Sequence, residues 1–179
     1  WLINLVENLL SVTRIEDGKM NLHLETELIE EVINEALNHI SHKKDEHRIE
    51  VKANDEFILA KIDAGLIIQV IINIVDNAIK YTPKGSMISI ETFKHKDFVE
   101  IQIADDGAGI SDKDKEKLFE MFYTVKHEVI DGRRGLGLGL ALCKAIIVAH
   151  GGNIAVKDNI PHGTIFSFTL PIKEVEIHE

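Results

Sequence analysis

The sequence has few cysteines, which crosslink a chain, and few prolines, which interrupt its helices and strands: one cysteine and three prolines among 179 residues. It also has only one tryptophan. A single cysteine, Cys143, excludes an internal disulfide and indicates a reducing compartment. Because Cys143 lies in an apolar helical pattern, we expect a small buried core residue. The longest apolar stretch, LIIQVIINIV, is interrupted by Gln69 and Asn73. It is much shorter than the roughly 20 residues that cross a membrane, so any membrane anchor is expected outside this sequence.

Positive charge is also scarce. Twenty basic residues stand against thirty acidic ones, which gives a formal net charge of −10. Such a surface repels a polyphosphate backbone, so the composition argues against nucleic-acid binding. A small anionic ligand is still compatible with this charge, provided that a few lysines and arginines gather at its site.

Helical and strand periodicities alternate along the chain and predict an α+β fold. Helices mixed with mostly hairpin-linked strands favour a two-layer sandwich, with the helices on one face of a mixed sheet. Helices are expected at residues 1–16, 28–40, 63–81, 111–122 and 140–150, the fourth with Ser111 as its N-cap. Strands are expected at residues 20–25, 48–53, 57–62, 86–93, 98–104, 153–157 and 163–172.

The helix expected at residues 63–81 carries a narrow polar stripe on an otherwise apolar surface. Asn73 and Asn77 stand four residues apart, and Lys80 and Tyr81 continue beside the same face. Since asparagine disfavours a helix interior, the pair indicates a cavity that uses their amides. An amide oxygen offers Mg²⁺ one neutral ligand, and Lys80 would meet a phosphate. The alternative is that both amides cap neighbouring loops.

Two glycine-rich stretches are further site candidates. ADDGAGI, with Gly107 and Gly109, follows an expected strand, where Asp-Gly is a common turn pair. The alternative is that the glycines let the backbone approach a flat ligand while Asp105 accepts hydrogen bonds from an exocyclic amine. GLGLGL, residues 135–140, leads directly into a helix, whose unpaired N–H groups and positive dipole end favour an anion. It does not fit the Rossmann or P-loop patterns.

The order of these signals is more specific than any one of them. An asparagine-bearing helix, D-x-G-x-G, a double-phenylalanine segment, G-x-G-x-G before a helix and Gly-Thr before a strand follow one another. Here the sequence resembles the ATP-binding catalytic domain of sensor histidine kinases, which share a nucleotide-binding group with gyrase, Hsp90 and MutL. The matching segments are NIVDNAIKYT (the N box), DDGAGI, LFEMF (the F box), GLGLGL and HGT before IFSFTLP. The resemblance covers nearly the whole chain and implies a Bergerat-type sandwich that binds ATP and Mg²⁺.

This resemblance assigns roles to individual residues. It implies that Asn77 binds the metal, that Asp105 reads the adenine amine and that Thr164 supports the base side. The loop at residues 123–134 would form a mobile lid over ATP. Asn73, Lys80, Arg133 and Arg134 would be the catalytic residues. The implied nucleotide contacts are Asn73, Asn77, Lys80, Tyr81, Asp105, Gly107, Gly109, Ile110, Phe122, Lys126, Gly135, Leu136, Gly137, Leu138, Gly139, Leu140 and Thr164.

Two departures from the related sequences bear on mechanism. Many family members place an arginine just after the F box to meet the γ-phosphate, whereas this chain has Thr124. Lys126, Arg133 or Arg134 is expected to replace it, although the two arginines also fit solvated lid charges. The hydrolysing relatives carry a glutamate, a base for water, near the position of Asn73. An amide cannot act as that base, so phosphoryl transfer to a histidine is favoured over hydrolysis.

The opening residues predict the organisation of a longer protein. WLINLVENLLSVTRIEDGKMNL resembles the end of a second dimerisation helix followed by a linker strand, most like the KdpD-type potassium-responsive kinases. We therefore expect a truncated dimerisation helix at residues 1–18, a linker strand at 19–27, the ATP-binding domain at 28–174 and a tail at 175–179. The phosphoacceptor histidine would precede Trp1. The histidines present, including His47, His150 and His162, are expected at the surface or at the ends of elements.

The function expected is therefore the catalytic domain of a two-component kinase. It would transfer the γ-phosphoryl group of Mg-ATP to the upstream histidine, for relay to an aspartate of a response regulator. The parent protein would be a homodimer in a bacterial cell membrane, with this domain in the cytoplasm. Two alternatives remain: an ATP hydrolase of the gyrase, Hsp90 or MutL kind, and an interaction module that retains the fold without catalysis.

Overall fold

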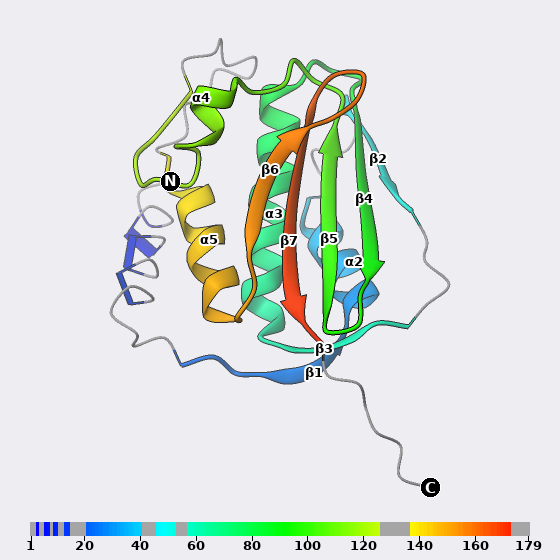
Figure 1. Cartoon of the computed structure of the whole chain (residues 1–179), viewed down its shortest axis with the longest axis vertical. Helices are drawn as coiled ribbons and strands as arrows, with labels where there is room; N and C mark the ends of the chain where they lie inside the picture. The colour runs from blue at the N-terminus through cyan, green and yellow to red at the C-terminus, as the bar shows by residue number, and fades with distance from the viewer. Residues whose placement is uncertain are drawn as a thin grey trace, which may run out of the picture.

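The computed structural model describes residues 21–40, 46–52, 57–125 and 137–172, together with positions 3, 6, 7, 9, 10, 13 and 14. The chain forms two layers, a sheet in front and helices behind it (Figure 1). The expected α+β sandwich, with helices on one face of a mixed sheet, is confirmed. The strands are β1 (Glu25–Leu28), β2 (Arg48–Val51), β3 (Leu59–Ile62), β4 (Met87–Lys94), β5 (Phe98–Asp105), β6 (Ile154–Asp158) and β7 (Thr164–Pro171). The helices are α2 (Ile29–His39), α3 (Ala64–Tyr81), α4 (Asp112–Lys115) and α5 (Gly139–Ala149).

The five-stranded sheet has the order β2-β4-β5-β7-β6. β2 pairs with β4 in parallel, and the other neighbours are antiparallel. Alternate residues of β5 are buried, as expected for a sheet covered on one face. The register aligns Ile103 with Ile90 on one side and with Phe166 on the other. Because these side chains share a face, they form one apolar surface against the helices.

The central helix α3 supports the site described below. Asp63 caps its N-terminus, with Oδ1 accepting a hydrogen bond from Leu66 N at 3.3 Å. The helix ends where Thr82 turns to an extended conformation before Pro83. By length and composition alone α3 could cross a membrane, but here it is a core helix packed against α2 and α5. Its buried residues are Ile67, Val70, Ile71, Ile74, Val75 and Ala78, and each large one contributes about 1.5–3 kcal/mol to the free energy of folding.

Two expected elements differ in extent from the observed ones. The strand expected at residues 20–25 begins only at Glu25, because its partner β3 is four residues long. The helix expected at residues 111–122 has one regular turn, α4, although Ser111 caps it as predicted. After α4 the chain continues in tight turns, which bring Phe119 edge-on to Phe166 at a ring-centroid distance of 6.3 Å. This aromatic pair packs where the sequence had predicted a continued helix.

His47 is more buried than an element-end histidine usually is. It lies directly before β2, at an element end as expected, yet it is 9% exposed and lies against the end of α3. No local pattern marks it as buried, because its burial depends on a contact with Thr82, 35 residues away. Cys143, by contrast, is fully buried as predicted.

Candidate functional site

The candidate site lies at one end of the sandwich, at the top of Figure 1. Four elements converge there: the C-terminal ends of α3 and β5, the start of β7 and the start of α5. α4 lies beside them. The topology thus gathers three segments singled out by their sequences, namely the asparagine helix, the D-x-G-x-G turn and the residues before α5.

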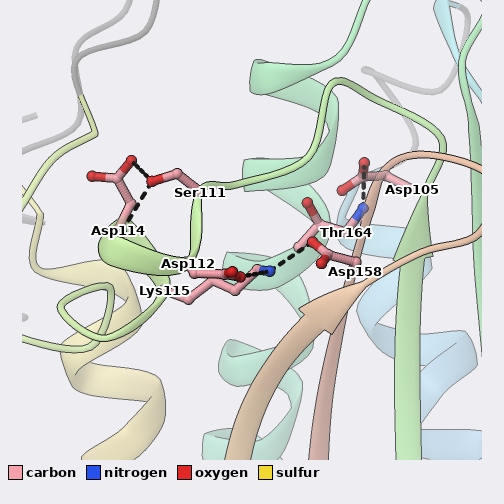
Figure 2. Close-up of polar contacts among 7 residues, drawn as sticks. All are labelled: Asp105, Ser111, Asp112, Asp114, Lys115, Asp158 and Thr164. Atoms are coloured by element: carbon pink, nitrogen blue, oxygen red, sulfur yellow. Dashed lines mark hydrogen bonds and ion pairs between the residues drawn. The ribbon is translucent and has the colours of Figure 1, made fainter.

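Asp105 is the most constrained polar residue of this end. It is the last residue of β5 and is 8% exposed. Its Oδ1 accepts hydrogen bonds from Gly107 N at 2.9 Å and from Thr164 N at 3.3 Å, the latter contact drawn in Figure 2. Burial raises the pKa of this carboxyl group, and the two backbone bonds oppose the rise. Within the described residues Oδ2 makes no hydrogen bond, so one oxygen is fixed and the other is available to a ligand.

Glycines bring the backbone close together around Asp105. Gly163 has a φ of +111°, and a Cβ on it would collide with the carbonyl oxygen of Asp105. Gly109 has a φ of +79° and faces the carbonyl oxygen of Gly163 at 3.3 Å from the position of a Cβ. Only glycine tolerates this backbone and this approach. Ile110, the next residue, packs against the core, so the turn is anchored at its far end.

Asn73 has an unusual environment in the middle of α3. Its Nδ2 is buried and has no hydrogen-bond partner within the described residues. The amide carbon lies 3.9 Å from where a Cβ of Gly139 would be, so the side chain faces the start of α5. It also lies beside Cys143, whose thiol pKa is raised to about 12 by burial, with the Asn73 side chain opposing that rise. The Asn73 side chain would stabilise a Cys143 thiolate. With the thiol neutral, Asn73 Nδ2 makes no hydrogen bond to it.

Three further polar residues, Asn77, Lys80 and Tyr81, lie in the C-terminal part of α3. Asn77 is half-buried, and its side chain makes no hydrogen bond within the described part of the chain. Lys80 places Nζ 5.2 Å from the ring centroid of Tyr81. Burial raises the pKa of Tyr81, which nevertheless stays 39% exposed. These residues are polar and partly accessible, as their predicted contacts with phosphates and metal require.

The residues on either side of the expected lid are joined to each other. Phe122 N donates to Gly137 O at 3.0 Å, and both residues have positive φ, +63° and +71°. Leu138 is buried, and Leu140 packs against the core. Leu138 precedes α5 and makes no side-chain cap bond, so it leaves the first-turn N–H groups of α5 uncapped. Lys126, Arg133, Arg134, Gly135 and Leu136 lie outside the described residues.

Lys115 fixes α4 to the sheet through an ion pair, shown in Figure 2. Lys115 Nζ lies 2.8 Å from Asp112 Oδ1 and 2.6 Å from Asp158 Oδ1, and so connects α4 to the end of β6. Tyr123 donates its hydroxyl to Asp114 Oδ1 at 2.6 Å, and this bond raises the pKa of the tyrosine. These contacts hold the segment that precedes the expected lid.

Two residues that sequence reasoning missed hold the D-x-G-x-G turn from the β6–β7 loop. Asn159 Nδ2 donates to Asp105 O at 2.8 Å, and His162 Nδ1 pairs with Gly107 O at 3.2 Å. His162 is the first residue of HGT, residues 162–164, and Asn159 lies three residues before it, so the HGT motif was the available signal. Among the described residues no group of three His, Cys, Asp or Glu side chains is placed to hold a metal ion.

Comparisons with known proteins agree with this arrangement. The model of the histidine kinase-, DNA gyrase B- and HSP90-like ATPase family matches residues 62–174. The sensor protein KdpD of Clostridium acetobutylicum is 43% identical over 171 residues, which is 96% of this chain and 19% of KdpD. The chain therefore spans about a fifth of the length of that relative. The predicted likeness to KdpD-type kinases is confirmed.

Two solved structures share the fold. Full-length ShkA in complex with AMPPNP is 26% identical, with a TM-score of 0.78, and the match covers 95% of this chain and 35% of ShkA. The histidine kinase ThkA in complex with the response regulator TrrA is also 26% identical, with a TM-score of 0.73. That match covers 96% of this chain and 49% of ThkA.

Proposed function

Because this chain belongs to the histidine kinase-, DNA gyrase B- and HSP90-like ATPase family, we propose that it is the domain that binds Mg-ATP for a sensor histidine kinase. The γ-phosphoryl acceptor would be a histidine on a dimerisation helix that precedes residue 1. The response regulator would then receive the group on an aspartate. The complexes of ShkA with AMPPNP and of ThkA with TrrA support the nucleotide and the partner by similarity.

The observation that carries this proposal is the geometry of Asp105. A buried carboxylate whose Oδ1 is held by two backbone amides presents Oδ2 as an acceptor of fixed direction. An exocyclic amine is the complementary donor, and the glycines at positions 107, 109 and 163 leave room for a flat base beside it. A guanine, which offers a carbonyl oxygen at the corresponding position, would face the carboxylate with repulsion.

The phosphates are proposed to lie between α3 and the start of α5. The buried Nδ2 of Asn73, which has no partner within the described residues, and the uncapped start of α5 both offer N–H donors to an anion. Asn77 Oδ1 is a neutral oxygen of the kind Mg²⁺ accepts, and Lys80 supplies a positive charge. These donors fit a phosphate-bound Mg²⁺. When bound, Mg²⁺ neutralises phosphate charge and orients the γ-phosphoryl group.

In the proposed reaction an imidazole nitrogen of the acceptor attacks the γ-phosphorus. A P–N bond forms while the bond to the bridging β,γ-oxygen breaks, and its electron pair leaves on ADP. The chain's own residues bind and orient the nucleotide, exclude water and compensate charge. Lys126, Arg133 and Arg134 are proposed to stabilise the transferring group from the lid. Asn73 carries an amide and not a carboxylate, so it cannot act as the base that activates water. This supports phosphoryl transfer to a histidine over hydrolysis.

The organisation of the parent protein is also part of the proposal. Residues 1–18 would end a dimerisation helix, 19–27 would form the linker and 28–174 the ATP-binding domain, before a short tail. The parent would be a homodimer anchored in a bacterial membrane, with this domain in the cytoplasm. KdpD similarity over 96% of the chain supports this organisation.

Phosphate release and phosphotransfer distinguish the proposal from its alternatives. Incubated alone with γ-labelled ATP and Mg²⁺, the chain should bind nucleotide yet release almost no phosphate. Its full-length parent should label its own histidine. Steady phosphate release by the chain alone would favour a hydrolase instead, and absent ATP binding would favour an interaction module.

A further inference from the structure

His47 is a buried, titratable side chain that the proposed function does not use. It lies directly before β2, and its two neighbours are fixed to the turn that follows α3. Gly85 N donates to Glu46 O at 2.6 Å, and Arg48 N donates to Ser86 O at 3.0 Å. An ion pair of 2.6 Å between Lys84 and Glu46 adds to this connection. The backbone on both sides of His47 is therefore held, and its side chain has a defined direction.

The ring of His47 supports Thr82, the residue at which α3 ends. His47 Nε2 lies 2.9 Å from Thr82 Oγ1. Thr82 Oγ1 donates its own hydrogen to Ala78 O at 2.6 Å, so it accepts from His47 and the ring carries its proton on Nε2. The Nδ1 atom is buried and has no partner within the described residues. Thr82, which is 3% exposed, is thus fixed from two sides.

Thr82 in turn packs on the turn that holds Asp105. A Cβ on Gly107 would lie 2.7 Å from Thr82 Cγ2 and 3.0 Å from Asp105 Oδ1. Gly107 N is also one of the two donors that fix that carboxylate oxygen. The Thr82 methyl group therefore lies against Gly107, next to the carboxylate oxygen that Gly107 N fixes. A continuous set of contacts runs from His47 through Thr82 and Gly107 to Asp105.

We propose that His47 is a positioning residue for the base end of the nucleotide site. By donating to Thr82 Oγ1, it acts together with the Thr82 hydrogen bond to Ala78 O to fix the rotamer that presents Cγ2 to Gly107. The direction of Asp105 Oδ2, and with it the preference for an adenine over a guanine base, depends on this contact. This inference rests on the proposed function, because it concerns the site at which the base would bind.

A hydrophobic side chain of similar size would fill the space of His47 without holding Thr82. The Thr82 hydroxyl would still donate to Ala78 O, so α3 would keep its end, but the accepted hydrogen bond would be lost. Leaving one buried hydrogen bond unmade typically changes an equilibrium by about tenfold. We expect the change to appear in base recognition, because the contacts lead to Asp105 and not to Asn77 or Lys80.

The test uses the chain as it is and measures the dissociation constants of ATP, GTP and tripolyphosphate by calorimetry, with the thermal midpoint of each variant. His47→Leu should weaken ATP binding about fivefold to tenfold, leave tripolyphosphate unchanged and narrow the preference for ATP over GTP. His47→Gln, whose amide can donate to Thr82, should restore ATP binding to within about twofold. The exposed His39, changed to leucine, is the matched control and should bind like the wild type.

A double variant isolates the path. Thr82→Val removes the hydroxyl, and with it both the bond from His47 and the bond to Ala78 O. It should weaken ATP binding at least as much as His47→Leu does, and His47→Leu added to it should have no further effect. If His47→Leu does not fold, the test uses the other two variants: Thr82→Val should weaken ATP binding, and His47→Gln should bind ATP nearly as the wild type does. A folded His47→Leu or Thr82→Val with wild-type ATP affinity and ATP/GTP preference overturns the inference. Equal loss for ATP and tripolyphosphate overturns it too, whereas a wild-type chain that binds no ATP overturns the proposed function instead.

Discussion

The backbone amide of Thr164 donates a 3.3 Å hydrogen bond to Asp105 Oδ1, which joins the first residue of β7 to the last residue of β5. Gly107 N donates to the same oxygen at 2.9 Å. Both structural donors therefore use one carboxylate oxygen, and the other makes no hydrogen bond within the described residues. Folding and the proposed recognition of a base thus make separable demands on this residue.

Asp105→Asn should retain the fold and lose ATP. The amide oxygen can accept from Gly107 N and Thr164 N as Oδ1 does, so the thermal midpoint should change little. The amide nitrogen would replace the oxygen that is proposed to accept from the adenine amine, and ATP affinity should fall by about tenfold or more. Calorimetry and circular dichroism check both parts. Asp97→Asn, at the exposed turn beyond the other end of β5, is the control and should not affect binding.

The affinity for ATP should depend on pH through Asp105. Burial raises the pKa of its carboxyl group in the folded chain, so the folded state holds this proton more tightly than the unfolded state. Its contribution to the free energy of unfolding therefore decreases as pH rises through the folded pKa. Binding has the opposite sign, because the adenine amine needs the ionised carboxylate. ATP affinity should fall on mild acidification, at a pH above the ordinary pKa of an aspartate side chain.

Titrations of the wild type and Asp105→Asn over the same pH series separate this effect from titration of the phosphates. The difference between the two proteins should shrink as the pH decreases. A constant difference down to the pH at which the chain unfolds would mean that Asp105 does not read the base.

Gly163 and Gly85 provide a matched pair for backbone strain. Both have positive φ, +111° and +86°, but only at Gly163 would a Cβ collide with neighbouring backbone. Gly163→Ala should lower the free energy of unfolding by about 3 kcal/mol or more, and Gly85→Ala by about 1 kcal/mol. Urea denaturation measures both values. Equal losses would show that the approach of Gly163 to Asp105 O is looser than described.

Cys143 should report on opening of the core. Its thiol is fully buried, and burial raises its pKa to about 12, so the native chain has almost no accessible thiolate. Alkylation at neutral pH should be about 1,000-fold slower than in denaturant, and saturating ATP should slow it further. Labelling at the rate of a free cysteine, with the circular dichroism unchanged, is the outcome that contradicts this burial.

Strong local periodicity is what made much of the fold predictable. α3, the β4–β5 hairpin and α5 lie within a few residues of where apolar spacing put them. The pairing of β1 with β3 was not predictable, because a four-residue strand finds its partner through the surrounding packing. α4 is short for a similar reason, since the position of Phe166 determines where Phe119 must lie.

The candidate site divides in the same way. The order of the motifs predicted that Asn73, Asn77, Asp105 and Thr164 belong to one site, and the fold places them at one end of the sandwich. Their contacts with a ligand stay predictions. Asn159, His162 and His47 were missed as part of the site. Each acts through a contact with a residue at least 35 positions away, and no spacing in the sequence encodes such a contact.

The most direct test of the central claim is a calorimetric titration of this chain with ATP, with and without Mg²⁺, for the wild type and Asn77→Ala. We expect Mg²⁺-dependent binding by the wild type in the micromolar to millimolar range, about −8 to −4 kcal/mol. Asn77→Ala should stay folded and lose the Mg²⁺-dependent part. No heat and no thermal stabilisation of the folded wild-type chain at saturating ATP would contradict the assignment of a nucleotide site to this end of the sandwich.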